Sequence, residues 1–149
     1  MNKLVFIFFI TYLNALPLYL KPIYYFKTMN LSKIEKRFLN YAKISKFGGK
    51  FVAKRRIFNP NYRDYMGRTN VDRMRQGLAP IGKDGRAIEL HHLKQKDNGV
   101  IVEMTNYEHN KYSKDLHRYT RQSEIDRYEF EKWKRAYWKN RANDFYRIK

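Results

Sequence analysis

The chain has 149 residues, of which 43% are hydrophobic, enough for one domain with a core and a short extension. Its 32 Lys and Arg residues outnumber 14 Asp and Glu residues and give a formal net charge of +18. This excess produces a strongly positive surface field, for which nucleic acid is the first natural partner and an anionic membrane the second. The absence of cysteine excludes disulfides and thiolate metal sites, so any metal must be bound by nitrogen or oxygen.

Residues 1–28 form an apolar segment outside the predicted domain. One lysine precedes the apolar run Leu4–Ile10, and Ala15 is a candidate cleavage site, as in a secretory signal peptide. An uncleaved membrane anchor is the second interpretation, although Pro17 interrupts the ~20 apolar residues that a spanning helix needs. A third is an over-extended start, because Met29 begins a sequence of soluble character. The protein would then be secreted, membrane-attached or cytoplasmic, respectively.

Residues 29–70 are predicted to form a basic N-terminal extension, partly helical and partly irregular. Apolar residues recur at roughly helical spacing from Leu31 to Phe47, and Gly48-Gly49 is expected to end that helix. The basic and aromatic segment from Phe51 to Arg75 is predicted to be an irregular connector that ends in a short helix, closed by Gly77.

The next block has the clearest organisation. Asp84-Gly85 is a hairpin turn signal between the arms Leu78–Ile81 and Arg86–His91. A polar loop then leads to the apolar strand Val100–Met104. The spacing from Thr105 to Glu108 is that of a capping box, which starts a helix at once. The predicted order is therefore strand, strand, helix.

The C-terminal part is predicted to be one long amphipathic helix. Ser123 and Asp126 are candidate caps, and Phe130, Trp133 and Tyr137 repeat at helical spacing. Basic residues occupy most other positions of this helix. We interpret the aromatic stripe as core packing, with stacking on bases as the alternative.

Four histidines follow one another within this block. His91 and His92 are adjacent at the end of the first strand, His109 is early in the helix, and His117 comes eight residues later. Histidine binds metals and accepts protons near neutral pH. Cleavage of a phosphodiester needs both, because a base must take a proton from the attacking water and a cation must neutralise charge on the scissile phosphate. The cluster therefore predicts a metal-assisted site.

The spacing between the last two histidines adds a condition. Eight residues along an unbroken α-helix advance about 12 Å, whereas imidazole nitrogens lie ~2.0–2.1 Å from a bound metal. Either the helix breaks, or only one of His109 and His117 binds the metal. Because Asn110 and Ser113 are weak helix formers, we expect a break between them.

The motifs of this region occur in a distinctive order. They are, along the chain, Met74, Gly77-Leu78-Ala79-Pro80-Ile81-Gly82, Asp84-Gly85, Glu89-Leu90-His91-His92, Gln95, Glu108-His109, Leu116-His117, Ser123-Glu124-Ile125-Asp126, Phe130, Tyr137-Trp138 and Arg141-Ala142. From Val71 to Ala142 the pattern resembles the LHH family of the HNH/endonuclease VII superfamily. The resemblance implies an α+β fold: a small ββα-metal core in residues 71–149, with flanking helices and the long C-terminal amphipathic helix.

The resemblance also implies roles for the four histidines. His92 corresponds to the general base, and His91 to a ligand of one divalent metal ion. His109 and His117 correspond to metal ligands on the helix side. The identity of the ion stays open between Mg, Mn, Ni and Zn.

Two further motif positions, Glu89 and Gln95, are expected to support the site without performing chemistry. Basic side chains near the motif are expected to contact the nucleic-acid backbone, a contact that carries little sequence information. The candidates for this contact are Lys94, Lys96, Arg118 and Arg121.

The function implied by the resemblance is a metal-dependent endonuclease that hydrolyses DNA phosphodiester bonds with little sequence specificity. In this family such a domain is a bacterial toxin effector module, often part of a larger secreted protein and neutralised by an immunity protein. The alternatives are an RNase, a non-catalytic nucleic-acid-binding protein with an HNH-like fold, and a membrane-acting basic protein that depends on residues 1–28.

Overall fold

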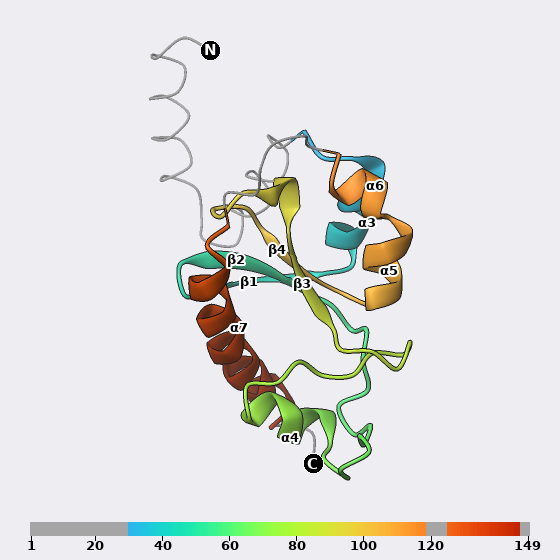
Figure 1. Cartoon of the computed structure of the whole chain (residues 1–149), viewed down its shortest axis with the longest axis vertical. Helices are drawn as coiled ribbons and strands as arrows, with labels where there is room; N and C mark the ends of the chain where they lie inside the picture. The colour runs from blue at the N-terminus through green and yellow to red at the C-terminus, as the bar shows by residue number, and fades with distance from the viewer. Residues whose placement is uncertain (1–29, 119–124, 147–149) are drawn as a thin grey trace. The chain divides into compact units, whose positions relative to one another are not determined.

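The computed structural model describes residues 30–118 and 125–146 (Figure 1). The predicted signal or anchor, the candidate cap Ser123 and the candidate contact Arg121 lie outside the described residues. The elements are α3 (Lys33–Asn40), β1 (Lys43–Phe47), β2 (Lys50–Lys54), α4 (Asn70–Arg75), β3 (Glu89–His92), η1 (Leu93–Gln95), β4 (Ile101–Met104), α5 (Asn106–Lys111), α6 (Ser113–Leu116), α7 (Arg127–Ala142) and η2 (Asn143–Phe145). Among the described residues, no helix has the length and apolar content that a membrane crossing requires.

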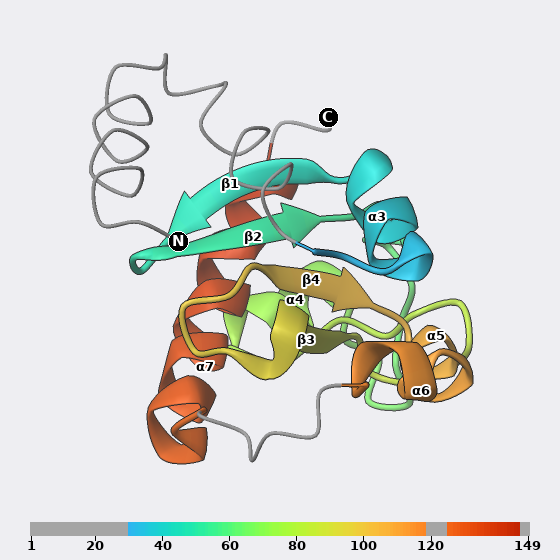
Figure 2. The same cartoon turned by 90° about the horizontal axis from the view of Figure 1, so that it is seen from above.

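One sheet organises these elements, with the strand order β1-β2-β4-β3 (Figure 2). β1 pairs antiparallel with β2, β2 parallel with β4, and β4 antiparallel with β3. The predicted α+β class and the strand–strand–helix order are confirmed, since α5 follows β4 directly. β3 is an edge strand, so one side of it has no neighbouring strand among the described residues.

The prediction of one helix from Leu31 to Phe47 is wrong beyond Asn40. The segment Lys43–Phe47 is instead the first arm of a β-hairpin, and the segment predicted to be irregular begins with the second arm, Lys50–Lys54. Gly48 and Gly49 have φ angles of 53° and 80° and form the two-residue turn between the arms. Such hairpin turns need positive φ at both positions, which glycine adopts without steric cost. The two strands join the same sheet as the predicted nuclease core.

The predicted hairpin around Asp84-Gly85 forms only in part. The turn is present, with the Gly85 N–H donating to the Gly82 carbonyl at 3.0 Å. The arms meet at a single bridge between Ile81 and Ala87, and β3 pairs with β4 instead. Pro80 has no N–H to donate, which makes the first arm a poor partner for a continuous ladder.

The predicted start of α5 is confirmed atom by atom. The Thr105 hydroxyl accepts a hydrogen bond from the Glu108 N–H at 3.1 Å, and the Glu108 carboxylate accepts one from the Thr105 N–H at 3.0 Å. The predicted break is also present, because α5 ends at Lys111 and α6 begins at Ser113. Tyr112 separates them with φ −103° and ψ 17°.

The long C-terminal helix is confirmed as α7, which lies along one face of the sheet, with α3, α5 and α6 on the other side (Figures 1 and 2). Its cap is Asp126, whose carboxylate accepts hydrogen bonds from two backbone N–H groups of the first turn. Trp133 stacks on Tyr137 with ring centroids 5.2 Å apart, and both rings contact Phe47 of β1 edge-on. The aromatic stripe is therefore core packing, as interpreted from its spacing.

A buried carboxylate fixes α7 to the sheet. Glu103 of β4 is fully buried. Its oxygens accept hydrogen bonds from the Tyr137 hydroxyl at 2.5 Å and the Arg141 Nε at 2.8 Å, both on α7. The backbone N–H of Arg55, just after β2, donates to the same carboxylate at 2.8 Å. Burial and the adjacent Glu103 charge raise the pKa of Tyr137, so its hydroxyl stays protonated as a donor.

Candidate metal centre

Three histidines from separate elements converge on one point. One ring nitrogen each of His91, His109 and His117 lies within 4.8 Å of the other two. The ring centroids are 5.1 to 5.3 Å apart. His91 belongs to β3, His109 to α5, and His117 follows α6 directly. The break at Tyr112 lets both helix-side rings reach the same point, which an unbroken helix could not do.

Polar partners on the Nδ1 atoms orient the rings of His109 and His117. The Nδ1 of His109 lies 2.9 Å from the Glu89 carboxylate, which also accepts a hydrogen bond from the Asn106 amide. The Nδ1 of His117 lies 3.1 Å from the Ser113 carbonyl. A carbonyl only accepts, so the His117 Nδ1 is the protonated one and Nε2 is left for a ligand. A carboxylate or carbonyl partner on the far nitrogen is the usual support of a metal-binding histidine.

The His91 ring also has a nitrogen that is left for a ligand. Its Nε2 is buried and has no hydrogen-bond partner among the described residues. Burial, together with the nearby His109, His117 and His92, lowers the pKa of His91 to about 3. The ring is therefore neutral at pH 7, the form that binds metals. An orphaned buried nitrogen within reach of two more imidazoles fits a divalent cation.

His92 lies on the other face of β3. Its ring contacts Phe130 of α7 edge-on, with centroids 4.4 Å apart, and its Nε2 is also buried without a partner among the described residues. Burial and the positive charge of Lys50 lower the pKa of His92 to about 4, so the ring is neutral at pH 7 and can accept a proton. Strand alternation directs the two adjacent rings to opposite faces, because His92 still has extended backbone angles of φ −77° and ψ 118°.

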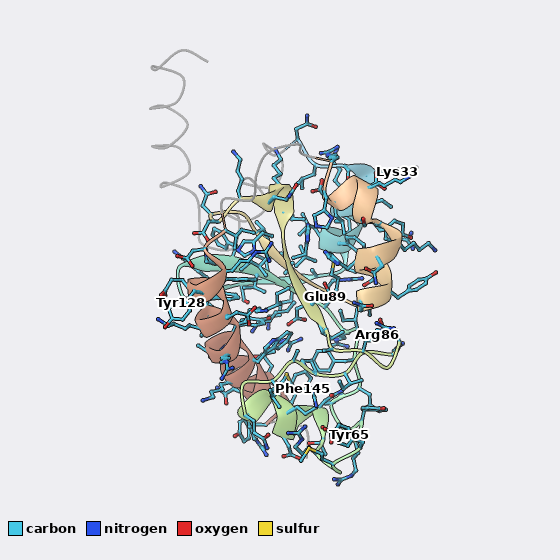
Figure 3. The ribbon with its side chains drawn as sticks, in the orientation of Figure 1. Lys33, Tyr65, Arg86, Glu89, Tyr128 and Phe145 are labelled. Atoms are coloured by element: carbon cyan, nitrogen blue, oxygen red, sulfur yellow. The ribbon has the colours of Figure 1, made fainter. Side chains whose placement is uncertain are left out.

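Both adjacent histidines line one cavity of 360 Å³. The cavity lies at the free edge of β3, which side chains from both faces can reach. Figure 3 shows Glu89 on β3, between α5 and α7. The other lining residues include His109, His117 and Gln95, and from α7 Arg127, Phe130, Glu131 and Lys134. A volume of this size falls within the range of small-molecule sites and accommodates a phosphodiester group with water.

A strained turn follows the histidine pair. Lys94 and Gln95 both have left-handed backbone angles, φ 59° and φ 54°. Such a conformation costs non-glycine residues ~1–3 kcal/mol each and is concentrated at functional sites. It places the Gln95 side chain at the cavity, where its carbonyl oxygen is buried without a partner among the described residues. Nothing in the sequence signals this conformation.

Three of the predicted basic contacts lie among the described residues, and none of them lines the histidine cavity. Lys94 is half-buried and Lys96 is exposed. Arg118 lies 3.5 Å from the buried carboxylate of Glu35 on α3. Two cations line the cavity from α7, Arg127 and Lys134, and neither is among the candidates predicted from the sequence.

Replacing Glu89 with glutamine is expected to lower the affinity for a divalent metal by about 10–100-fold, because an oriented carboxylate partner makes His109 a better ligand. Calorimetric titration of metal into metal-free protein measures this. Glu131→Gln is the matched control, because Glu131 lines the same cavity but pairs with Lys134. Equal affinities of Glu89→Gln and wild type would contradict the support role.

Comparison with known families gives an independent finding. The model of a family described as "a nuclease of the HNH/ENDO VII superfamily with conserved LHH" matches residues 69–144, about half of the chain. No solved structure matches the chain. The matched region contains β3, β4, α5, α6 and α7, with all four histidines. The chain therefore belongs to the LHH family of HNH/ENDO VII superfamily nucleases.

Proposed function

We propose that this nuclease is a metal-dependent endonuclease that hydrolyses phosphodiester bonds of DNA with little sequence specificity. The observation that supports this most is the arrangement of the four histidines. Three can bind one cation, with ring nitrogens within 4.8 Å of one another, and the fourth is neutral and faces the same cavity. HNH-type nucleases use divalent metals, and this cluster provides the ligands for one.

Different residues would perform the three tasks of the reaction: metal binding, proton acceptance and phosphate binding. His91, His109 and His117 would hold the divalent ion, which supplies charge neutralisation at the scissile phosphate when bound. The Nε2 of His92 accepts the proton of the attacking water. Arg127 and Lys134, on α7 at the cavity wall, pair with phosphate oxygens.

Low sequence specificity follows from the charge of the protein. A net charge of +18 favours contacts with the phosphate backbone, which position a nucleic acid without reading its bases. Binding and cleavage should therefore weaken steeply as salt rises. The preference for DNA and a role as a bacterial toxin effector rest on the family resemblance. An acidic immunity protein would complement the same charge.

A supercoiled-plasmid nicking assay tests the proposal. Protein stripped with EDTA should leave the plasmid intact, and addition of one of Mg²⁺, Mn²⁺, Ni²⁺ or Zn²⁺ should restore nicking. A structured RNA in parallel distinguishes an RNase, since cleavage of RNA alone would overturn the preference for DNA. Full nicking in EDTA would contradict metal dependence. No nicking with any of the ions would favour a non-catalytic binding protein.

A further inference from the structure

A second cavity, of 460 Å³, lies between α3, α5 and the segment after β2. It shares none of its described lining residues with the histidine cavity. The two cavities use different faces of α5. His109 faces the metal centre, whereas Tyr107 and Glu108 face the second cavity. Nothing in the metal chemistry accounts for this second site.

The second cavity is positively charged. Among its described lining residues, four are cationic and one, Glu108, is anionic. Arg55 neutralises Glu108 through two parallel hydrogen bonds of 2.8 Å each. This bidentate pair also fixes Arg55 in place. The remaining cations, Arg37, Arg56 and Lys83, are exposed and free of a carboxylate within the lining. They suit phosphate groups.

Exposed aromatic rings border the same cavity. Tyr41 is 86% exposed and Tyr107 is 59% exposed, so most of each side chain is open to solvent. The ammonium group of Lys111 lies 5.3 Å from the Tyr107 ring centre and 5.5 Å from that of Tyr112. These cation–π contacts favour a defined orientation of the rings. Tyrosine rings beside cations are the elements with which proteins bind unpaired bases.

We propose that the second cavity binds single-stranded nucleic acid, with Arg37, Arg56 and Lys83 at the phosphates and Tyr41 and Tyr107 stacked on bases. Bases in a duplex are already stacked and present only their edges, so the rings favour an unpaired strand. The inference rests on the proposed function for the class of ligand. It adds a binding site outside the cleavage site.

Fluorescence anisotropy with a labelled single strand of about 12 nucleotides tests the inference. EDTA is present throughout, so no strand is cut. Tyr107→Ala should raise the Kd for the single strand about 5-fold or more, and Arg56→Ala should raise it and make it less salt-dependent. Tyr107→Phe should keep wild-type affinity, because the ring and not the hydroxyl stacks. For a duplex of equal length, Tyr107→Ala should change the Kd by less than about 2-fold, because a residue that does not contact the ligand affects its affinity no more than that.

The chain offers a closely matched control. Tyr128 lies on α7 (Figure 3) and is 70% exposed. The Lys132 ammonium, four residues along the helix, lies 4.2 Å from its ring centre, as Lys111 lies over Tyr107. Tyr128 does not line the second cavity. Tyr128→Ala should therefore leave single-strand affinity unchanged.

Each outcome decides one of the two proposals. Unchanged single-strand affinity in Tyr107→Ala and Arg56→Ala would overturn the inference. An acidic protein surface would then be the favoured partner of these cations. An equal loss of duplex affinity would overturn the preference for single strands. If the wild type never nicks and Tyr107→Ala lowers single-strand affinity, the proposed function is contradicted and the inference stands. If the wild type nicks with metal and Tyr107→Ala leaves single-strand affinity unchanged, only the proposed function stands.

Discussion

Replacing His92 with alanine is expected to lower the rate of plasmid nicking by about 10²–10⁴-fold, the usual contribution of a general base. The ring is neutral at pH 7 because burial lowers its pKa to about 4, and its Nε2 has no other partner among the described residues. His92 is not one of the three histidines whose nitrogens converge. Metal affinity should therefore remain close to that of the wild type. Initial nicking rates at saturating metal measure the effect.

A rescue experiment separates lost chemistry from lost packing. The alanine variant leaves space beside Phe130, which contacts the His92 ring in the wild type. Imidazole added to the buffer should enter that space and restore part of the nicking rate of His92→Ala. It should not restore a variant that lacks a metal ligand, such as His91→Ala. A wild-type nicking rate in His92→Ala without imidazole would remove His92 from the mechanism.

Replacing Glu103 with alanine is expected to lower the free energy of unfolding by about 3–5 kcal/mol, the usual cost of removing one partner of a buried ion pair. Glu103 is fully buried, and Arg141, its ionic partner, is 6% exposed. Without the carboxylate, the buried guanidinium keeps Asp144 at 2.8 Å but loses the acceptor of its Nε, and the Tyr137 hydroxyl loses its acceptor. Urea unfolding followed by the fluorescence of Trp133 and Trp138 measures the loss.

Glu129→Ala is the matched control for this prediction. Glu129 also pairs with a cation of α7, Lys132, at 3.0 Å, but both side chains are exposed. Exposed pairs are screened by water and contribute little, so this variant should unfold close to the wild-type urea concentration. If Glu103→Ala were no less stable than Glu129→Ala, the buried network would not be what fixes α7 to the sheet.

The parts of the fold that depend on local signals could be predicted from the sequence. The capping box from Thr105 to Glu108, the cap at Asp126 and the break after Lys111 each depend on side chains a few residues apart. The hairpin around Gly48-Gly49 was missed because a glycine pair ends helices and also forms two-residue hairpin turns. The parallel pairing of Val52 with Ile101 joins residues far apart in sequence and has no local signal.

The residues of the site also fall into those with a local sequence signal and those without one. Adjacent histidines in a familiar motif indicated the chemistry, and strand alternation accounts for their different surroundings. The pairing of Glu89 with His109 depends on how α5 packs beside β3, which no local pattern encodes. The same holds for Arg127 and Lys134, which reach the cavity only because α7 lies along that face of the sheet. Glu103 is the one acid in the apolar strand Val100–Met104, a pattern that indicates a buried partner without identifying it.

The proposed mechanism gives the adjacent histidines different roles: His91 binds the metal, and His92 accepts a proton from the attacking water. Calorimetric titration of a divalent ion into metal-free protein tests it most directly, with the wild type, His91→Ala and His92→Ala compared under one condition. We predict one ion per chain, bound with similar affinity by the wild type and His92→Ala, and at least 10-fold weaker binding by His91→Ala. Wild-type affinity in His91→Ala, or loss of binding in His92→Ala, would contradict this division of roles.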